Sequence, residues 1–294
     1  MVRTDETRLD PAQQRTNNRG RSPVTSPRNL IPTAFIGHGS PMNAIEPNPW
    51  SPTWRSFAQR LPNVRAILCI SAHWYVSGTG VTAMTRPRTI HDFGGFPQEL
   101  FEFDYSAPGD PELAHTIASA LAPLEVSLDH EWGLDHGTWS VLCHMFPTAT
   151  VPVVQLSIDA TQSATFHFNL AQRLRELRAN GIFILGSGNL VHNLRATFRA
   201  PGGFSAAPLD WNVRFDGLVR ELIDDRNDLR LTRYDELGPD ASLAIPTPDH
   251  YLPLLYVLGA RYPEEDVRFI TNGYQGAGLS MTSVTFGDAV DTKV

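Results

Sequence analysis

Short apolar segments recur along the chain, each roughly as long as a β-strand and each ended by glycine, proline or a polar turn. The most continuous are Val64–Trp74 and Ile182–Ser187. Apolar runs of this length without alternation are typical of strands covered on both faces, as in a parallel sheet between helices. Other segments with strand-like patterns are Thr33–Gly39, Thr79–Met84, Val151–Ile158 and Ser280–Phe286.

Segments with helical periodicity lie between these strands. In Pro111–Ala122 the apolar residues recur on one face, and Asp110 is a suitable N-cap before a proline at the first helical position. Residues 163–179 form a second amphipathic pattern, which ends at Gly181. The remaining expected helices are Trp54–Arg60, Ser140–Phe146 and Trp211–Ile223, and an apolar segment, Leu252–Leu258, follows a proline-rich entry.

Strands that alternate with helices predict an α/β fold, with a central, largely parallel or mixed sheet flanked by helices. The chain shows no internal repeat and no composition break, and 294 residues suffice for one large domain. Residues 1–29 are rich in Arg, Asn, Thr, Ser and Pro and lack an apolar signal segment. We therefore expect a disordered tail over 1–29 and a single domain over 30–294.

Composition excludes several classes of protein. The formal net charge of -7 argues against a surface for nucleic acid or anionic membrane. No apolar run approaches the roughly 18 residues of a membrane span. The only two cysteines, Cys69 and Cys143, both lie in apolar segments, which indicates a reducing compartment rather than a disulfide framework. We therefore expect a cytoplasmic protein with no nucleic-acid or membrane partner.

Four of the ten histidines share one context, because each adjoins an apolar element at a turn marked by glycine or proline. They are His38, His73, His192 and His250. Neutral imidazole is a common ligand for Zn, Fe, Cu and Ni, and the carboxyl ends of parallel strands converge on one crevice. The pattern therefore favours a metal site. The alternative is that these are hydrogen-bonded core or capping histidines.

The other histidines divide into groups. His136 lies in a Gly-containing loop beside Asp135, where it is either a pocket residue or a loop histidine bonded to the backbone. His91, followed by Phe93 and Phe96, suits a lid or pocket wall. We expect His115, His144 and His167 to be structural and His130 to be solvated. The chain has no HExxH, paired CxxC, Walker loop or GxSxG motif, and Gly186-Ser187-Gly188 does not continue as a nucleophile elbow.

Six motifs, taken in order, resemble the 4,5-DOPA extradiol dioxygenase family, part of the class III (LigB-type) ring-cleavage enzymes. The resemblance runs from about residue 33 to 287, over essentially the whole chain after the tail, and as an ordered set the motifs are highly specific. They are Gly37-His38-Gly39-Ser40-Pro41, Ser71-Ala72-His73-Trp74, His91-Asp92-Phe93-Gly94-Gly95-Phe96-Pro97, Gly133-Leu134-Asp135-His136-Gly137, Gly188-Asn189-Leu190-Val191-His192-Asn193-Leu194 and Pro248-Asp249-His250-Tyr251-Leu252-Pro253-Leu254-Leu255-Tyr256.

This resemblance implies roles for five histidines. His38 and His73 match two metal ligands, and His250 matches a third, which is a glutamate in the classical LigB branch. His192 matches a residue described either as an acid/base catalyst or as a further ligand, so both roles stay open. His136 matches a second active-site histidine that contacts substrate, and we expect it to act with His192 in proton transfer.

The resemblance also implies a single α/β domain over 30–294 that holds a non-haem metal, with Fe(II) for activity and Zn(II) as a plausible occupant. The expected reaction inserts O2 into the ring of a small catechol. A Zn-dependent hydrolase on the same histidines and a non-enzymatic binding protein of the Memo type are the alternatives. Asp249 and Glu46 are candidates for a carboxylate near the metal. No cationic residue stands out as a partner for a substrate carboxylate.

Overall fold

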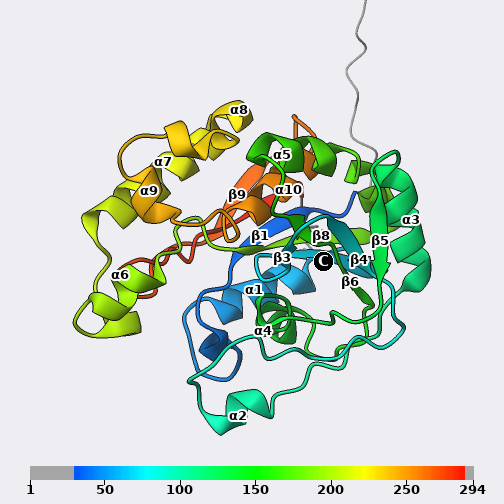
Figure 1. Ribbon diagram of the computed structural model, residues 1–294, viewed down its shortest axis with the longest axis horizontal. Coiled ribbons are helices and arrows are strands. Elements are labelled where there is room, and N and C mark those ends of the chain that lie inside the picture. Colours follow the sequence, from blue (N-terminus) through cyan, green and yellow to red (C-terminus); the bar gives the residue numbers. More distant parts are fainter. Residues whose placement is uncertain (1–29, 289–294) are drawn as a thin grey trace, which may run out of the picture.

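The computed structural model describes residues 30–288, and a six-stranded sheet forms the centre of that part of the chain (Figure 1). Its order is β6-β2-β8-β1-β10-β9. The first four strands run parallel, and β10 is antiparallel to both β1 and β9. The bounds are β1 (Thr33–Gly37), β2 (Ala66–Ser71), β6 (Val153–Gln155), β8 (Ile182–Gly188), β9 (Val267–Thr271) and β10 (Ser283–Phe286). The predicted mixed, mostly parallel sheet is confirmed.

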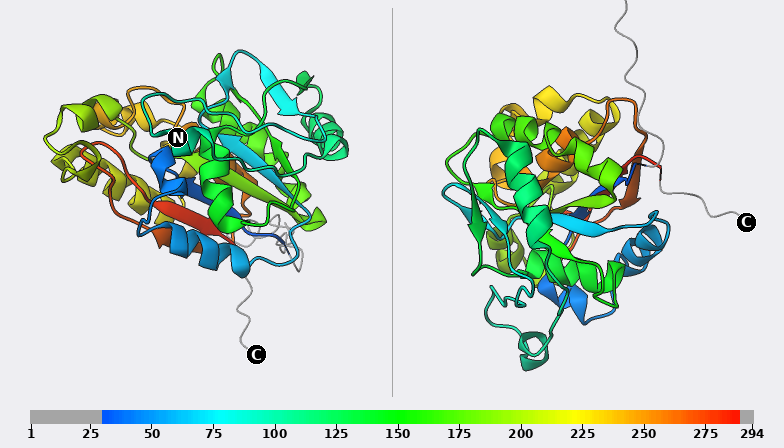
Figure 2. Two further views of the ribbon diagram at one scale, coloured as in Figure 1. Left: turned by 90° about the horizontal axis from the view of Figure 1, so that it is seen from below. Right: turned by 90° about the vertical axis from the view of Figure 1, so that its right-hand side faces the viewer.

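Helices cover both faces of this sheet, and Figure 2 shows the strands between them from two further directions. Two small parallel sheets, β3-β7 and β4-β5, lie outside the main one. Their strands are β3 (Tyr75–Val76), β4 (Thr79–Thr82), β5 (Val126–Asp129) and β7 (Ile158–Asp159). The α-helices are α1 (Ser51–Gln59), α2 (Gln98–Phe101), α3 (Pro111–Leu121), α4 (His136–Met145), α5 (Ala164–Gln172), α6 (Leu194–Arg199), α7 (Asp210–Asp224), α8 (Asp228–Leu231), α9 (Ala241–Ala244) and α10 (Leu252–Ala260). The 3-10 helices are η2 (Pro41–Ala44), η3 (Arg175–Asn180), η4 (Gly203–Ser205) and η5 (Tyr234–Glu236).

The alternation of side chains along each strand divides the core into two layers. In β2, Ala66, Leu68 and Ile70 belong to the hydrophobic cluster that contains residues of α5 and α10, whereas Ile67 and Cys69 belong to the cluster around α1 and α4. All five are fully buried. Since successive side chains of a strand point to opposite faces, a strand covered on both sides needs apolar residues at every position. This explains the continuous apolar runs in the sequence.

Several predicted elements differ in length from those observed. Helix α4 begins at His136 rather than at Ser140, because the Asp135 side chain accepts a hydrogen bond from the backbone N–H of Thr138 and caps the helix earlier. Residues 163–179 divide into α5 and η3, and the predicted stop at Gly181 is confirmed by its φ of 79°. The predicted N-cap at Asp110 is also confirmed.

Two further sequence predictions concern strands and the chain ends. The segment predicted as one strand over 151–158 forms β6 and β7, which pair in different sheets. The predicted tail over 1–29 lies outside the described residues, as do residues 289–294, so the proposed boundaries of the domain stay a prediction. Within residues 30–288, no helix combines the length and the apolar character that a membrane crossing needs.

Helices α5 and α10 pack so closely that a glycine is required between them. A Cβ atom on Gly259 would lie 2.3 Å from the carbonyl oxygen of Phe168 and 2.8 Å from Cβ of Ala171. We expect Gly259→Ala to separate the helices and to lower the free energy of unfolding by about 1–3 kcal/mol in denaturant titrations. Gly217→Ala is the control, because this exposed position in α7 has open space and alanine is the better helix former. Equal stability of both variants would contradict this account.

The buried His167 of α5 makes the stability of the folded protein sensitive to acid. Its Nδ1 lies 2.9 Å from the Tyr256 hydroxyl, and burial lowers the pKa of His167 to about 4. Between pH 6.5 and 4 the unfolded chain therefore binds more protons than the folded one, and stability falls as the pH falls. The free energy of unfolding should fall between pH 7 and pH 4.5 in both proteins. We expect the fall to be smaller by about 2–3 kcal/mol in His167→Gln than in the unaltered protein. The exposed His130, changed to Gln, should leave that fall unchanged.

Candidate metal centre

The parallel strands β1, β8 and β2 deliver the first two histidines to one edge of the sheet. Ser187 of β8 stands opposite Ile36 of β1 and Ser71 of β2. His38 immediately follows β1, and His73 lies two residues after β2. Their Nε2 atoms are 3.3 Å apart. The prediction that these strand-end histidines converge is confirmed.

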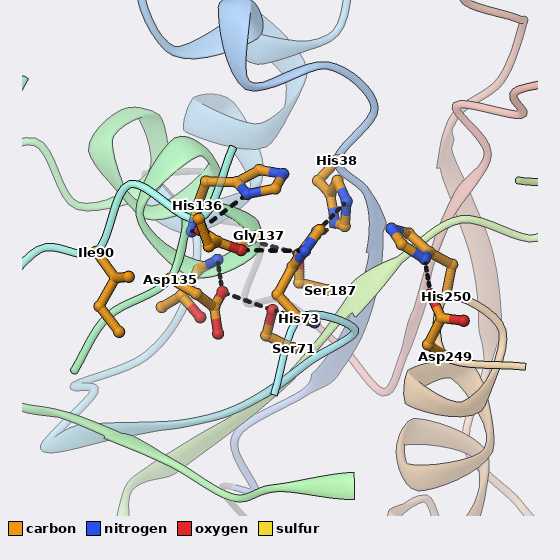
Figure 3. Close-up of polar contacts among 12 residues, drawn as sticks. His38, Ser71, His73, Ile90, Asp135, His136, Gly137, Ser187, Asp249 and His250 are labelled. Carbon is orange, nitrogen blue, oxygen red and sulfur yellow. Dashed lines mark hydrogen bonds and ion pairs between the residues drawn. The ribbon is translucent and has the colours of Figure 1, made fainter. Parts of the chain in front are cut away.

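Three more histidines surround this pair. His136, the first residue of α4, has its ring centroid 3.8 Å from that of His73. His250, in the turn before α10, lies 5.0 Å from His73 and 5.3 Å from His38 by ring centroids (Figure 3). His192 follows β8, and its ring stacks on that of His250 at 3.4 Å. Five histidines from distant parts of the sequence therefore form one cluster, which we call the histidine cluster.

The orientation of the His38 ring is fixed by a buried serine. The Ser187 hydroxyl donates to the carbonyl of Gly137 at 2.5 Å, and the same oxygen lies 2.9 Å from Nδ1 of His38. An oxygen whose hydrogen is already donated must accept the N–H of His38, so the ring carries its proton on Nδ1. The lone pair on Nε2 then points toward His73.

One carboxylate orients two further rings. Asp92, in the loop between β4 and α2, has one oxygen 3.1 Å from Nδ1 of His73 and the other 3.0 Å from Nδ1 of His136. It also accepts the backbone N–H of His136 at 2.9 Å. These contacts leave Nε2 of both histidines for other partners. A carboxylate that holds the outer nitrogen of a histidine is a recurring support for metal ligands.

His250 has the same kind of support from its neighbour in sequence. Nδ1 of His250 contacts the carboxylate of Asp249. Nε2 of His250 is buried and has no hydrogen-bond partner among residues 30–288. A buried polar atom without a partner is costly, and a bound cation would satisfy it. This orphaned nitrogen and the facing Nε2 atoms of His38 and His73 fit a metal ion.

Burial keeps most of these rings neutral at pH 7. Burial, together with repulsion from neighbouring imidazoles, lowers the pKa of His38 and of His192 well below the usual value. Burial also lowers the pKa of His136 to about 4 and lowers the pKa of His250 against the opposing effect of Asp249. Neutral imidazole is the form that binds metal, so these four rings are ready to donate lone pairs.

The pKa values of His73, Asp92 and Asp249 are shifted toward the charged form of each group. Burial would lower the pKa of His73, but the hydrogen bond to Asp92 and the nearby carboxylates outweigh it and raise the pKa. Burial raises the pKa of Asp92 and Asp249, yet hydrogen bonds to the histidines outweigh it and hold both pKa values well below the usual range. The outer nitrogens of the histidine cluster therefore face two ionised carboxylates.

A buried network places α4 against the strand ends. The Asp135 carboxylate accepts hydrogen bonds from Ser71 at 2.6 Å and from the Gln155 side chain at 2.7 Å, and it is fully buried. The contact is close enough to exclude a side chain at Gly137, where a Cβ would lie 2.5 Å from Oγ of Ser71 and 2.8 Å from Cδ2 of His73. Asp135 therefore fixes both the start of α4 and the distance between His136 and His73.

The structure changes the role expected for His136 and distinguishes the two candidate carboxylates. Nitrogen atoms of His38, His73 and His136 lie within 4.8 Å of one another, so His136, which the sequence assigned to substrate contact, is also placed to ligate. The ligand set His38, His73, His192 and His250 stays a prediction. Of the two candidate carboxylates, Asp249 lies behind His250, whereas Glu46 is exposed in the turn after η2.

Two contributors were not identified from sequence. Asp92 was quoted only as part of a loop motif, and Ser187 was considered only as a nucleophile. The sequence signal available for Ser187 was its position at the end of the apolar strand segment Ile182–Ser187. Of the remaining histidines, His144 and His91 bind backbone carbonyls of Asn43 and Phe103, at 2.7 and 2.9 Å.

Comparison with known proteins identifies the family and the fold. The family model described as the catalytic LigB subunit of aromatic ring-opening dioxygenase matches residues 32–287. This chain belongs to the LigB family. The family is catalytic, so the prediction of an extradiol ring-cleavage enzyme is confirmed at the level of the family.

Relatives of this LigB-family chain match along most of its length. A protein of Escherichia coli (strain K12) named 4,5-DOPA dioxygenase extradiol is 46% identical over 262 residues, which cover 87% of this chain and 95% of that protein. A Beta vulgaris protein of the same name is 36% identical over 267 residues, covering 88% and 97%. The crystal structure of an uncharacterized Escherichia coli K12 protein matches with a TM-score of 0.75 at 39% identity, covering 87% of this chain and all of that one.

If Asp92 supports the LigB metal centre, its charge should matter for metal affinity. We expect Asp92→Asn to weaken binding of Zn(II) or Fe(II) by about 10–100-fold, because the variant removes the charge behind both His73 and His136. Titration against a competing chelator measures the affinity, and circular dichroism checks the fold. Asp104→Asn is the matched control, because this exposed carboxylate precedes α3 and accepts hydrogen bonds from the Thr89 and Ser106 side chains. Equal affinities in the two variants would rule out the support role.

Proposed function

We propose that this LigB-family protein opens the ring of a catechol with O2, using a divalent metal at the histidine cluster. Fe(II) is the metal that we expect in the active enzyme, with Zn(II) able to occupy the same ligands. The observation that carries the proposal is that nitrogen atoms of His38, His73 and His136 lie within 4.8 Å of one another, while the buried Nε2 of the adjoining His250 has no hydrogen-bond partner among residues 30–288. This arrangement is typical of histidines that ligate a metal.

The proposed ligands are His38, His73 and His250. A metal bound there would act as a Lewis acid toward the catechol oxygens and would hold O2 beside the ring, and the catechol itself would supply the electrons for O2 reduction. The protein holds the rings in place through Ser187 and the carboxylates of Asp92 and Asp249, so that little reorganisation accompanies binding.

The remaining two rings suit proton transfer. His136 and His192 are neutral at pH 7, because burial lowers both pKa values, so each can accept a proton from a catechol hydroxyl and return it later in the reaction. Asp92 lies 3.0 Å from Nδ1 of His136 and would stabilise the protonated ring. His192 stacks directly on His250, which keeps it beside the ligand set.

Aromatic side chains beside His136 provide a wall for an aromatic substrate. The Phe93 ring contacts that of His136 edge to face at 5.5 Å and that of Phe96 at 5.2 Å. Edge-to-face packing of this kind favours a flat ring in the adjoining space. These contacts support a role for the loop over 91–97 as a lid or pocket wall.

A cytoplasmic location also belongs to the proposal. Cys69 is buried and Cys143 is half-buried, and both thiols are free. Free thiols and an oxidisable Fe(II) site both suit a reducing compartment.

Oxygen consumption by protein purified without oxygen and loaded with Fe(II) tests the reaction. With a panel of simple catechols as substrates, we expect uptake of O2 and a yellow ring-opened product. His38→Ala and His73→Ala should lose both metal and activity. Tight Zn(II) binding with no O2 uptake after Fe(II) loading would contradict the proposal and favour a hydrolase.

A second comparison separates ligands from proton-transfer residues. His136→Gln and His192→Gln should retain the metal but lose about 100-fold or more in kcat. Loss of metal affinity in either variant would instead identify that residue as a ligand. His115→Gln, on the exposed side of α3, should change neither quantity.

A further inference from the structure

A pair of amide side chains holds the loop that carries His38. Nδ2 of Asn43 donates to the backbone carbonyl of His38 at 2.9 Å. Gln275, in the loop between β9 and β10 (residues 272–282), accepts the backbone N–H of Ser40 on its Oε1 at 2.7 Å. The two amides also bind each other, since Nε2 of Gln275 donates to Oδ1 of Asn43 at 3.0 Å. We call Asn43 and Gln275 the amide pair.

The amide pair acts where the backbone is otherwise free to rotate. His38 is followed by Gly39, whose φ of 63° is a conformation that glycine adopts far more readily than other residues. The N–H of His38 donates to the carbonyl of Gly188 at 3.0 Å, and Asn43 holds the carbonyl of His38 on the other side. Both peptide groups of His38 are therefore fixed. With Ser187 bound to the ring, these contacts set the direction of Nε2.

Glycine at position 39 makes the close approach of Gln275 possible. A Cβ on Gly39 would lie 2.3 Å from Oε1 of Gln275 and 2.5 Å from Sδ of Met281. A larger residue at this position would therefore displace the amide from the N–H of Ser40. The contact with Gln275 thus explains a glycine of the first sequence motif.

Gln275 is itself held on a buried base. Its backbone N–H donates to the carbonyl of Leu279 at 3.2 Å, which closes the β9–β10 loop on itself. Asp216 of α7 is 1% exposed and accepts hydrogen bonds from the hydroxyls of Ser280 and Thr282. The end of the loop is therefore anchored to α7. A side chain on a fixed support can hold its partner in place, whereas one on a free loop cannot.

Asn43, the other member of the amide pair, is also fixed. It lies in η2 and is 3% exposed. Its backbone carbonyl accepts hydrogen bonds from Nε2 of His144 at 2.7 Å and from Nδ2 of Asn48 at 2.9 Å. Its side chain therefore starts from a fixed backbone and ends on His38 and Gln275.

We propose that Asn43 and Gln275 are positioning residues for the metal ligand His38. They hold the backbone on the carboxyl side of His38, so that Nε2 meets the ion without rearrangement. This inference rests on the proposed function in one respect, namely that His38 ligates the metal. It does not depend on which reaction the metal supports.

Zn(II) affinity and the absorption spectrum of bound Co(II) test this inference on the full-length protein. Gln275→Met keeps the length of the side chain but removes its hydrogen bonds to Ser40 and Asn43. We expect Zn(II) to bind about 10-fold more weakly in competition with a chelator. The visible bands of Co(II), which depend on coordination number and geometry, should also change. A purely structural residue would not change the spectrum of the folded, metal-loaded protein.

Asn212→Leu is the matched control, because this buried amide holds the same loop at a different point. Nδ2 of Asn212 donates to the carbonyl of Ala277 at 3.1 Å, and within residues 30–288 the side chain makes no hydrogen bond to residues 38–43. Its replacement should lower the free energy of unfolding but leave Zn(II) affinity and the Co(II) spectrum unchanged. If Gln275→Met and Asn212→Leu have equal effects on affinity and spectrum, the inference is wrong.

Asn43→Leu breaks the same link from the other side and serves if Gln275→Met does not fold. Circular dichroism of the metal-free proteins checks folding. Because the two amides act together on His38, the double variant should bind Zn(II) about as weakly as the weaker of the single variants. Losses of affinity that add in full would overturn the inference, since they would show two independent effects.

The inference and the proposed function fail in different ways. A protein that binds Zn(II) and Co(II) but opens no catechol after Fe(II) loading contradicts the proposed function, and the metal titrations still decide the role of the amide pair. A protein that opens catechols, while both single variants keep the unaltered Zn(II) affinity and Co(II) spectrum, retains the function and overturns the inference.

Discussion

The histidine cluster depends on the pairing of β8 with both β1 and β2. Because Ser187 stands opposite Ile36 and Ser71, the segments that carry the two strand-end histidines leave the sheet side by side. The Ser187 hydroxyl then joins the ring of His38 to the first turn of α4. A shift of one residue in this register would turn Ser187 to the other face of the sheet and remove the link.

Electrostatics complements this geometry. The cluster presents neutral nitrogens to its centre, while the ionised carboxylates of Asp92 and Asp249 lie behind them. The negative charge thus lies behind the imidazoles and reaches the centre of the cluster through them. Two such charges suit a divalent cation, and they would also stabilise a ring that gains a proton.

The sequence predicted the parts of the site that depend on local pattern. His38 and His73 could be found because each follows an apolar strand, and the strand pattern itself comes from burial on both faces. Asp92 could not be found in this way, since its role depends on a loop that folds back over α4, 44 residues further along the chain.

The separation of the cluster residues in sequence has a consequence for folding. His38 and His250 come from opposite ends of the domain, so their rings meet only after the central strands and α10 have assembled. An ion bound by both would recognise the folded chain but not the unfolded one. By mass action, it would then stabilise the entire domain, not only the active site. The amount of folded protein in a cell would follow the supply of the metal.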